Sequence, residues 1–192
     1  MHTLVLNGSP HKNGDSMKIF KTLRKHLIGE VTLFSAYDQL ISPCNDCRHC
    51  WQQTECPMAD QMQTLYSQIN EYDNVIIVSP LYFSELSGPL LSMCSRFQYF
   101  WTARQFRNIE LITKHKKGVL IIAGAGDGDT ISAERSADIL FHHLKTDCIG
   151  KVFSLKTAVT PAQKDYQALN QAKELAETLN THYLDNKSVH EN

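Results

Sequence analysis

Five short apolar runs recur along the chain, and each is followed by a segment with the period of an amphipathic helix. Short runs rich in β-branched residues predict strands, and the helical segments between them predict crossovers. A strand and a helix that alternate in this way predict an α/β fold, with a parallel sheet covered on both faces. The predicted strands are TLVLN at 3–7, VTLFS at 31–35, NVIIV at 74–78, GVLIIA at 118–123 and VFSLK at 152–156.

The helical segments carry apolar residues three and four positions apart, which predicts one buried face on each helix. The predicted faces are Ile19, Phe20, Leu23 and Leu27; Met62, Leu65, Tyr66 and Ile69; Leu90, Cys94, Phe97 and Trp101; and Ala133, Ala137, Leu140, Phe141 and Leu144. The last helix is predicted to open at Thr160, which can cap it, with Pro161 at the first helical position and Gln163 completing a capping box.

The order of the strands follows from how the runs are interrupted. The first, third and fourth runs are unbroken, as central strands buried on both faces must be, whereas Thr32 and Ser154 interrupt the second and fifth. This pattern matches the order 2-1-3-4-5 of a flavodoxin-like three-layer sandwich with a five-stranded parallel sheet. We therefore expect one flavodoxin-like domain over 1–184, with a cysteine-rich insert at 44–56 and a flexible tail at 185–192.

Charge and hydropathy exclude several classes of partner. The formal net charge is -1, so we expect neither a nucleic acid nor an acidic lipid surface as a partner. The apolar runs are far shorter than the roughly 20 residues that cross a bilayer, and the N-terminal residues do not read as a secretory signal. The sequence predicts a cytoplasmic protein that binds small molecules and has no membrane partner.

Ligands of open α/β sheets bind outside the carboxyl ends of the strands, where the strand order reverses, here between the first and third strands. The loop after the first strand, NGSPHKNGDS at 7–16, places the hydroxyls of Ser9 and Ser16 before a helix N-terminus. This composition suits a phosphate, although the G-K-[S/T] of a nucleoside-triphosphate loop is missing. The alternative is an ordinary turn that ends in a helix cap at Asp15 or Ser16.

Two further loops are expected at the same edge of the sheet. The loop SPLYFSELSGP at 79–89 places Tyr82 and Phe83 at the switch point, where they suit a flat heteroaromatic ring, or else pack in the core. The loop AGAGDGDT at 123–130 has glycines that let the backbone approach a ligand closely. A phosphate loop and a ring-binding loop at this switch point predict flavin mononucleotide, FMN.

Four cysteines fall within thirteen residues, in CNDCRHCWQQTEC at 44–56. In a reducing compartment such cysteines are more often metal ligands or redox thiols than disulfides. The compact spacing, with a proline after the fourth cysteine, is closer to a ferredoxin-type run than to the two separate knuckles of a zinc site. A 4Fe-4S cluster is the first expectation, with a zinc ion and free or oxidised thiols as alternatives. The predicted ligands are Cys44, Cys47, Cys50 and Cys56.

Three stretches together resemble the NADPH-dependent FMN reductase family, and particularly its iron-sulfur flavoprotein branch. They are GSPHKNGDS, CNDCRHCWQQTEC and YDNVIIVSPLYFSELSGPLLSMCSRF, and the similarity runs from about residue 1 to residue 130. The resemblance implies an FMN-dependent oxidoreductase that takes electrons from NAD(P)H and passes them to free flavin, a quinone or an iron-sulfur centre. It also implies a homodimer or homotetramer. The alternative is a flavodoxin-type electron carrier or redox sensor without catalytic turnover.

The resemblance also implies a set of FMN contacts, while no side chain is required as an acid, a base or a nucleophile. The FMN phosphate would lie among Ser9, His11, Asn13 and Ser16, the isoalloxazine along Pro80, Leu81, Tyr82 and Phe83, and the other edge of the flavin against Gly124 and Gly126. The sequence departs from the family pattern at His11, where Arg or Lys is usual, and at Asp15, where Asn is usual. It also departs at Ser95, where an acid usually precedes the arginine, and at Asp60, where paired acids are usual.

Overall fold

The computed structural model describes residues 1–38, 41–126 and 128–190, and within them the chain forms one five-stranded sheet. Every neighbouring pair of strands is parallel and the order is β2-β1-β3-β4-β5, which confirms the predicted flavodoxin-like sheet. The strands are β1 (His2–Asn7), β2 (Glu30–Ser35), β3 (Asn74–Pro80), β4 (Lys116–Ala123) and β5 (Thr146–Ser154).

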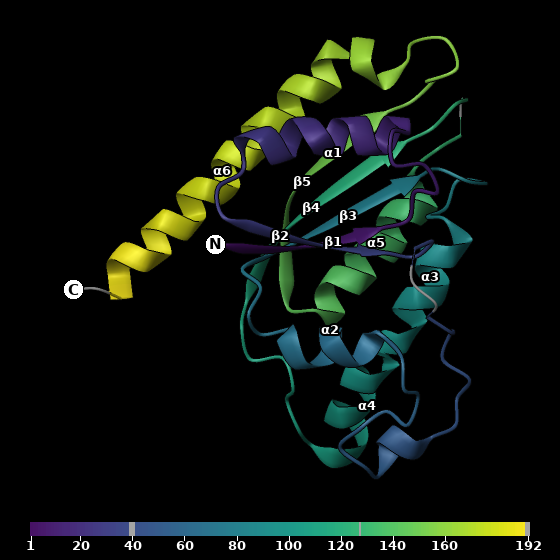
Figure 1. Cartoon of the computed structure of the whole chain (residues 1–192), viewed down its shortest axis with the longest axis vertical. Helices are drawn as coiled ribbons and strands as arrows, with labels where there is room; N and C mark the ends of the chain where they lie inside the picture. The colour runs from purple at the N-terminus through teal and green to yellow at the C-terminus, as the bar shows by residue number, and fades with distance from the viewer. Residues whose placement is uncertain (39–40, 127, 191–192) are drawn as a thin grey trace.

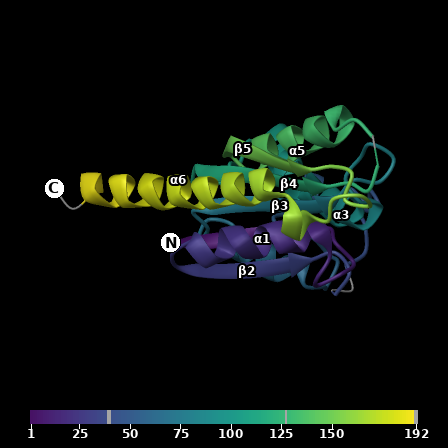
Figure 2. The ribbon, with the colours of Figure 1, turned by 90° about the horizontal axis from the view of Figure 1, so that it is seen from above.

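Helices cover both faces of the sheet and complete the three-layer sandwich. Figures 1 and 2 show α1 and α6 together on one face, with α2, α3, α4 and α5 on the other. The α-helices are α1 (Asp15–His26), α2 (Met62–Gln68), α3 (Gly88–Cys94), α4 (Gln98–Arg107), α5 (Ile131–His143) and α6 (Tyr166–His190). Three short 3-10 helices are η1 (His49–Trp51), η2 (Ser95–Phe97) and η3 (Ala162–Lys164).

The alternation of side chains along the strands builds two hydrophobic layers. In β3, Ile76 packs toward α1 and α6, whereas its neighbours Val75 and Ile77 pack toward α2 to α5. Because both faces of β3 are buried, the strand reads as an unbroken apolar run. In the edge strand β2, Glu30, Thr32 and Leu33 are exposed, which agrees with its interrupted sequence.

The register of the strands brings the three predicted loops to one edge. Asn7 at the end of β1 pairs with Val78 of β3, and Pro80 at the end of β3 pairs with Ala123 of β4. Beyond β1, the Gly8 N–H donates to the Val78 carbonyl at 2.7 Å. The segments that follow β1, β3 and β4 therefore leave the sheet side by side.

Two predicted elements have wrong boundaries. The single helix expected from Leu90 to Trp101 is divided into α3, η2 and α4. The strand expected at 152–156 is β5, which begins at Thr146, because backbone pairing with β4 extends over residues whose side chains do not form an apolar run. The strand ends at Ser154, and the chain then turns at Lys156, which has a φ of +64°.

The last helix also begins later than predicted. Residues 162–164 form η3, and α6 starts at Tyr166. Its N-terminus is capped by Asp165, whose carboxylate accepts the Ala168 N–H at 3.1 Å and the Ser154 hydroxyl at 2.7 Å. Residues 185–190 form the end of α6, and residues 191–192 lie outside the described residues, so the flexible tail stays a prediction. In Figure 2 the end of α6 projects beyond the sheet.

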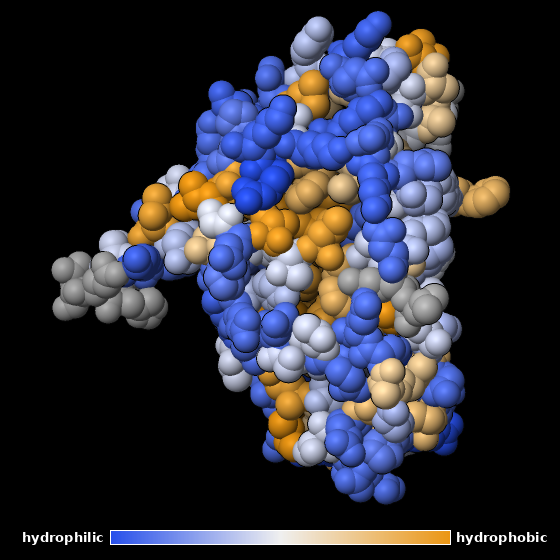
Figure 3. Space-filling model, viewed as in Figure 1, coloured by the Kyte–Doolittle hydropathy of each residue, from blue (hydrophilic) through white to orange (hydrophobic). Residues whose placement is uncertain are grey.

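The surface suits contact with another chain at the β2 edge. Figure 3 shows hydrophobic side chains gathered near the middle of the face along which β2 runs in Figure 1. Leu33 of β2 and Ile28 just before it are both about two-fifths exposed. Exposed apolar groups at a sheet edge favour association, but the predicted homodimer or homotetramer stays a prediction. Within the described ranges, no helix combines the length and apolarity that a membrane crossing needs.

Candidate functional site

The loop between β1 and α1 is held in shape by its own polar atoms. The Asn7 carboxamide oxygen accepts the Ser9 N–H at 2.9 Å, and the Ser9 hydroxyl oxygen accepts the His11 N–H at 3.3 Å. The Gly14 N–H then donates to the His11 carbonyl at 3.0 Å. These successive turns place the loop directly before the first turn of α1. Ser9 is buried within it, whereas His11 and Asn13 are exposed.

The N-terminus of α1 has no side-chain cap among the described residues. Asp15, one of the two caps that the sequence allowed, instead accepts the Ala162 N–H at 3.2 Å and the Lys18 ammonium at 3.3 Å. Ser16 is buried and makes no capping bond either. The predicted cap at Asp15 or Ser16 is therefore wrong, because the helix begins after Gly14 without a side-chain cap. The first N–H groups of α1 stay available, and with the helix dipole they can bind an anion.

The loop after β3 makes a tight turn with two exposed aromatic rings. Leu81 donates its N–H to the Ala123 carbonyl at 2.8 Å, and Tyr82 and Glu85 exchange two backbone hydrogen bonds of 3.0 Å. At the tip, Phe83 and Ser84 have φ values of +53° and +60°. Such left-handed conformations are uncommon for these residues and often mark ligand sites. Phe83 is fully exposed and Tyr82 is 44% exposed, so packing in the core does not explain them.

The three loops contact one another at the carboxyl edge of the sheet. A Cβ atom added at Gly8 would lie 2.6 Å from the Ser87 hydroxyl oxygen. The loops after β1 and β3 are therefore in contact at these two residues. A Cβ atom added at Gly124 would lie 3.3 Å from the Leu81 side chain. The loops after β3 and β4 are therefore in contact there as well. At Gly126 an added Cβ would meet no described atom within 4 Å, so the backbone there is open to a ligand. The neighbouring residue 127 lies outside the described residues.

Two residues of this crevice were missed by sequence reasoning. Ser87 is fully buried, and its hydroxyl has no hydrogen-bond partner in the described part of the chain. A buried unpartnered hydroxyl is rare, and it suits a polar ligand atom. Tyr37 follows β2, and its pKa is raised by burial and by the nearby Tyr82 phenol, while the Ser87 hydroxyl, which faces it, lowers it. A hydroxyl-rich loop hinted at Ser87, but nothing in the sequence showed which hydroxyl turns inward.

A second site lies under the cysteine-rich segment. Cys44, Cys47, Cys50 and Cys56 all line one cavity of about 350 Å³, together with side chains of η2 and α4. All six cysteines of the chain are described, and each is a free thiol. The segment is fixed on α4 by Trp51, whose ring stacks on Phe106 with 4.1 Å between ring centroids.

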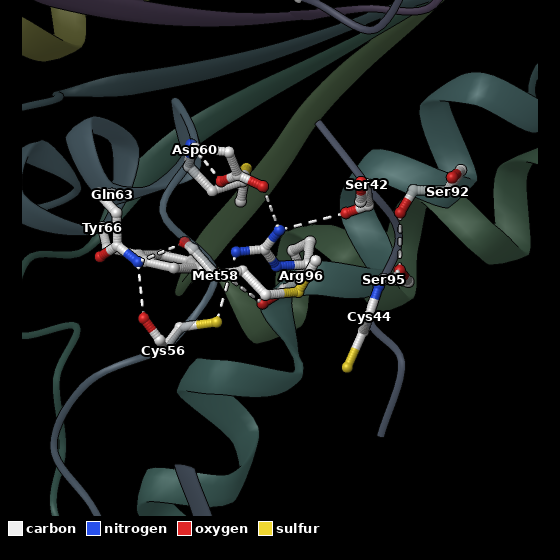
Figure 4. A network of polar contacts seen from close by, with 11 residues as sticks. Ser42, Cys44, Cys56, Met58, Asp60, Gln63, Tyr66, Ser92, Ser95 and Arg96 are labelled. Carbon is white, nitrogen blue, oxygen red and sulfur yellow. Dashed lines mark hydrogen bonds and ion pairs between the residues drawn. The ribbon is translucent and has the colours of Figure 1, made fainter. Parts of the chain in front are cut away.

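Arg96, in η2, is the buried centre of this second site (Figure 4). Its guanidinium donates to Asp60, to the Ser42 carbonyl at 3.1 Å and to the Cys56 sulfur at 3.3 Å. Burial alone would lower the pKa of Arg96, but Asp60, Tyr66 and Cys56 together raise it. The arginine therefore stays charged beneath the cysteines.

Two more hydroxyls reach the cysteine segment. Thr102 of α4 donates its hydroxyl to the Cys50 sulfur at 3.2 Å. Ser95, the residue that replaces an acid of the family pattern, accepts the Cys44 N–H at 2.9 Å. Sequence reasoning noted Arg96 and Ser95 only as positions in a pattern, and it missed Thr102. The Thr102–Cys50 and Ser95–Cys44 contacts could not be predicted from the sequence, because about 50 residues separate the two partners in each.

The four cysteines are potential ligands for a metal ion or a cluster. Within the described ranges, no three His, Cys, Asp or Glu side chains are gathered closely enough to hold a single metal ion. Zinc binds thiolates at about 2.3 Å, so its ligands must converge on one point. In a cluster each cysteine binds a different iron, and the sulfurs lie farther apart around a larger body. Four thiols therefore line one cavity, and two of their sulfurs accept hydrogen bonds, but the described side chains do not converge on a single-ion site.

Comparison with known families gives one match over most of the chain. Residues 1–160 match the model of the family described as NADPH-dependent FMN reductase. Among curated proteins, an iron-sulfur flavoprotein of Methanocaldococcus jannaschii is 25% identical over 111 residues, which cover 56% of this chain and 58% of that protein. An iron-sulfur flavoprotein of Clostridioides difficile is 33% identical over 90 residues, which cover 44% of this chain and 40% of that protein. The chain thus spans less than two thirds of the length of these relatives.

Solved structures share the fold over nearly the whole chain. An FMN-dependent NADH-azoreductase from Bacillus anthracis, in complex with FMN, superimposes with a TM-score of 0.66 at 19% identity. The alignment covers 93% of this chain and 99% of that one. An NAD(P)H:quinone oxidoreductase from Methanothermobacter marburgensis gives a TM-score of 0.67 at 14% identity, covering 94% and 97% of the two chains. At these identities the likeness establishes the fold.

Proposed function

Because the chain belongs to the NADPH-dependent FMN reductase family, we propose that it is an FMN-dependent oxidoreductase that moves electrons from NAD(P)H through flavin to an acceptor. Bound FMN would supply the chemistry, since its N5 accepts a hydride and the ring passes electrons on singly or in pairs. One observation carries the proposal, namely that the uncapped start of α1 and the exposed turn after β3 adjoin at the switch point of the sheet.

The residues of the crevice would share the work of binding FMN. We assign the phosphate to the N–H groups of α1 and to Ser9 and Ser16, with His11 and Asn13 at the outer rim. The Asp15 carboxylate accepts the Ala162 N–H and pairs with the Lys18 ammonium, which offsets its negative charge near the start of α1. These are the phosphate contacts that the sequence predicted, and they remain a proposal.

The flavin ring would lie along the turn after β3. The predicted contacts on this side are Pro80, Leu81, Tyr82 and Phe83, with Gly124 and Gly126 at the other edge. The exposed faces of Tyr82 and Phe83 support this assignment, because apolar faces with a few aimed hydrogen bonds suit an aromatic cofactor. The unpartnered Ser87 hydroxyl adds one such polar group to the crevice.

We extend the proposal to a 4Fe-4S cluster bound by Cys44, Cys47, Cys50 and Cys56, which would act as one acceptor for electrons from the flavin. The shared cavity and the donors to two of the sulfurs support this assignment. So do the iron-sulfur flavoproteins among the relatives. Free flavin or a quinone would be the alternative acceptors.

Anaerobic purification followed by turnover assays tests the proposal. We expect flavin absorption, about one FMN per chain, iron with sulfide, and oxidation of NADPH or NADH in the steady state with added FMN or a quinone. Turnover no faster than the free-flavin blank would contradict the enzyme and leave the electron carrier or redox sensor. The formal net charge of -1 argues against a carrier, because flavodoxin-type carriers are usually acidic.

The same preparation tests the remaining expectations about the chain. We propose that 1–184 fold as one domain, that the protein is a homodimer or homotetramer, and that it is cytoplasmic. A single cooperative unfolding transition is expected for one domain. Light scattering after size-exclusion chromatography would give the subunit count, and a monomer would contradict the proposed assembly.

A further inference from the structure

The turn at the tip of the loop after β3 has a conformation that its own residues do not favour. Tyr82 and Glu85 exchange two backbone hydrogen bonds of 3.0 Å. Between them, Phe83 and Ser84 have φ values of +53° and +60°, a region that is disfavoured for residues with a Cβ atom. The Phe83 ring is fully exposed, so burial does not offset this strain. Contacts with other parts of the chain must therefore maintain the turn.

Those contacts come from α5. The Ala133 N–H, one of the first N–H groups of that helix, donates to the Ser84 carbonyl at 3.2 Å. The partly buried Glu85 carboxylate accepts two hydrogen bonds, from the Leu86 N–H at 2.8 Å and from the Ser136 hydroxyl at 3.0 Å. Glu85 thus connects the turn after β3 to the second turn of α5, 51 positions further along the chain.

The turn also meets the loop after β4. A Cβ atom added at Gly128 would lie 3.4 Å from the Ser84 hydroxyl oxygen and 3.5 Å from the Leu81 side chain. The backbone of the turn is thus fixed by α5 and by the loop after β4, while the Tyr82 and Phe83 side chains stay exposed. A ring that is fixed without being buried can bind a flat ligand at a low cost in conformational entropy, because its position is set before binding.

We propose that Glu85 and Ser136 are positioning residues that hold the turn after β3 in its binding conformation, so that its two aromatic rings are preorganised for the isoalloxazine of FMN. The inference rests on the proposed function and adds to it two residues that need not touch the flavin. The phosphate end of the crevice is built separately, on the loop before α1. The contact between Glu85 and Ser136 should therefore affect binding of the flavin ring and leave the contribution of the phosphate unchanged.

The test compares two flavins that differ by the phosphate, FMN and riboflavin. Glu85→Ala removes both acceptor oxygens, so we expect the dissociation constants of both flavins to rise by the same factor, about tenfold. Ser136→Ala removes one of the two hydrogen bonds and should raise both constants by about threefold. Fluorescence titration of the full chain after removal of its flavin measures the constants, at a temperature where circular dichroism shows each variant to be folded.

Two further variants check that the contact acts through its geometry. Glu85→Gln keeps an oxygen for the Leu86 N–H and gains an amide that can donate to the Ser136 oxygen, so both constants should stay within about twofold of the parent values. Asp138→Asn is the matched control on the same helix, because Asp138 pairs with Lys151. It should change neither constant.

A glycine rescue separates positioning from a purely structural role. Ser84→Gly makes a φ of +60° favourable without outside help. In the Glu85→Ala background it should therefore restore most of the affinity for both flavins. If Glu85 only stabilised the folded state, Ser84→Gly would raise the free energy of unfolding and leave both constants as they are in Glu85→Ala, which would overturn the inference. If Glu85→Ala does not fold, Ser136→Ala replaces it in both measurements.

The outcomes also separate this inference from the proposed function. Affinities equal to those of the parent protein in Glu85→Ala and Ser136→Ala would overturn the inference and leave the oxidoreductase in place. A loss of affinity for FMN alone would do the same, because the effect would then lie at the phosphate. A parent protein that binds neither flavin would instead overturn the proposed function, and the inference with it.

Discussion

The flavin crevice and the cysteine cavity are built in different ways from neighbouring parts of the chain. The crevice uses backbone N–H groups, small hydroxyls and exposed rings at the ends of strands. Its loops are held by hydrogen bonds within each loop and by backbone hydrogen bonds between neighbouring strand ends. The cysteine cavity uses buried charges, with Arg96 joining Ser42, Cys56 and Asp60 over 36 to 54 positions of sequence. The first site depends on topology, and the second on long-range side-chain packing.

The largest expected effect would show that the two sites load independently. Cys56→Ser removes a predicted cluster ligand, so we expect complete loss of iron and sulfide, with FMN content unchanged because the crevice shares no residue with the cavity. Visible absorption and metal analysis of anaerobically purified protein measure both cofactors. Cys148→Ser is the matched control, since Cys148 lies in β5 away from the cavity and should keep full iron. Full iron in Cys56→Ser would refute the ligand assignment.

The next effect concerns the buried charge pair. Asp60→Asn leaves Arg96 buried without its carboxylate, which should cost about 3–5 kcal/mol of unfolding free energy. Urea unfolding of the iron-free protein measures the loss. Asp147→Asn is the control, because Asp147 pairs with Lys117 at the surface and should cost less than about 1 kcal/mol. Equal small losses in both variants would mean that the cavity does not depend on this pair.

A smaller effect is expected where two loops of the crevice touch. Gly8→Ala places a Cβ atom 2.6 Å from the Ser87 hydroxyl and 2.8 Å from the Leu90 Cβ, so we expect a loss of about 1–3 kcal/mol and weaker FMN binding. Gly88→Ala, where the new Cβ would meet no described atom within 4 Å, should change neither. Urea unfolding and FMN fluorescence titration measure the two effects. Unaltered FMN affinity in Gly8→Ala would place the flavin elsewhere.

The smallest expected effect concerns Lys116, which lies outside both sites, so it measures a change in stability that neither site causes. Lys116, at the start of β4, is 1% exposed, and burial, helped by Lys114 and Lys145, lowers its pKa to about 8. The unfolded value is about 10.4, so the charged ammonium penalises folding fully below pH 8 and progressively less up to about pH 10.4. From pH 9 to pH 10 the unfolding free energy should rise by about 1 kcal/mol relative to Lys116→Met. Parallel pH profiles for the two proteins would contradict this.

The sequence predicted the sheet well because its signal is local. Five apolar runs and the interruptions at Thr32 and Ser154 were sufficient to predict the strand order. A strand that is buried on both faces has an unbroken apolar sequence, which can be recognised in each strand separately. The errors fall where local and tertiary preferences compete. The apolar face from Leu90 to Trp101 is continuous in sequence, but the chain breaks at η2, where Arg96 turns inward to its partners.

The candidate sites were predictable to different depths for the same reason. Glycines and hydroxyl-bearing residues after β1 and β3 predicted binding loops, because those residue types are needed for the backbone geometry of such loops. The spacing of the four cysteines predicted that they are ligands of a metal ion or cluster. The contacts of Arg96 and Thr102 with Cys56 and Cys50 left no local pattern, because each partner lies 40 or more residues away. No local sequence pattern predicted that the Ser87 side chain turns inward either.

The sequence by itself determined the periodicity of each strand and helix, the order of the sheet and the edge at which ligands would bind, because each of these follows from which residues neighbour one another along the chain. Only the tertiary structure decided which charges are buried together. It set Arg96 against Asp60 and gathered four cysteines around one cavity. Electrostatic interactions depend on distance through space and on burial, and neither is encoded in local spacing.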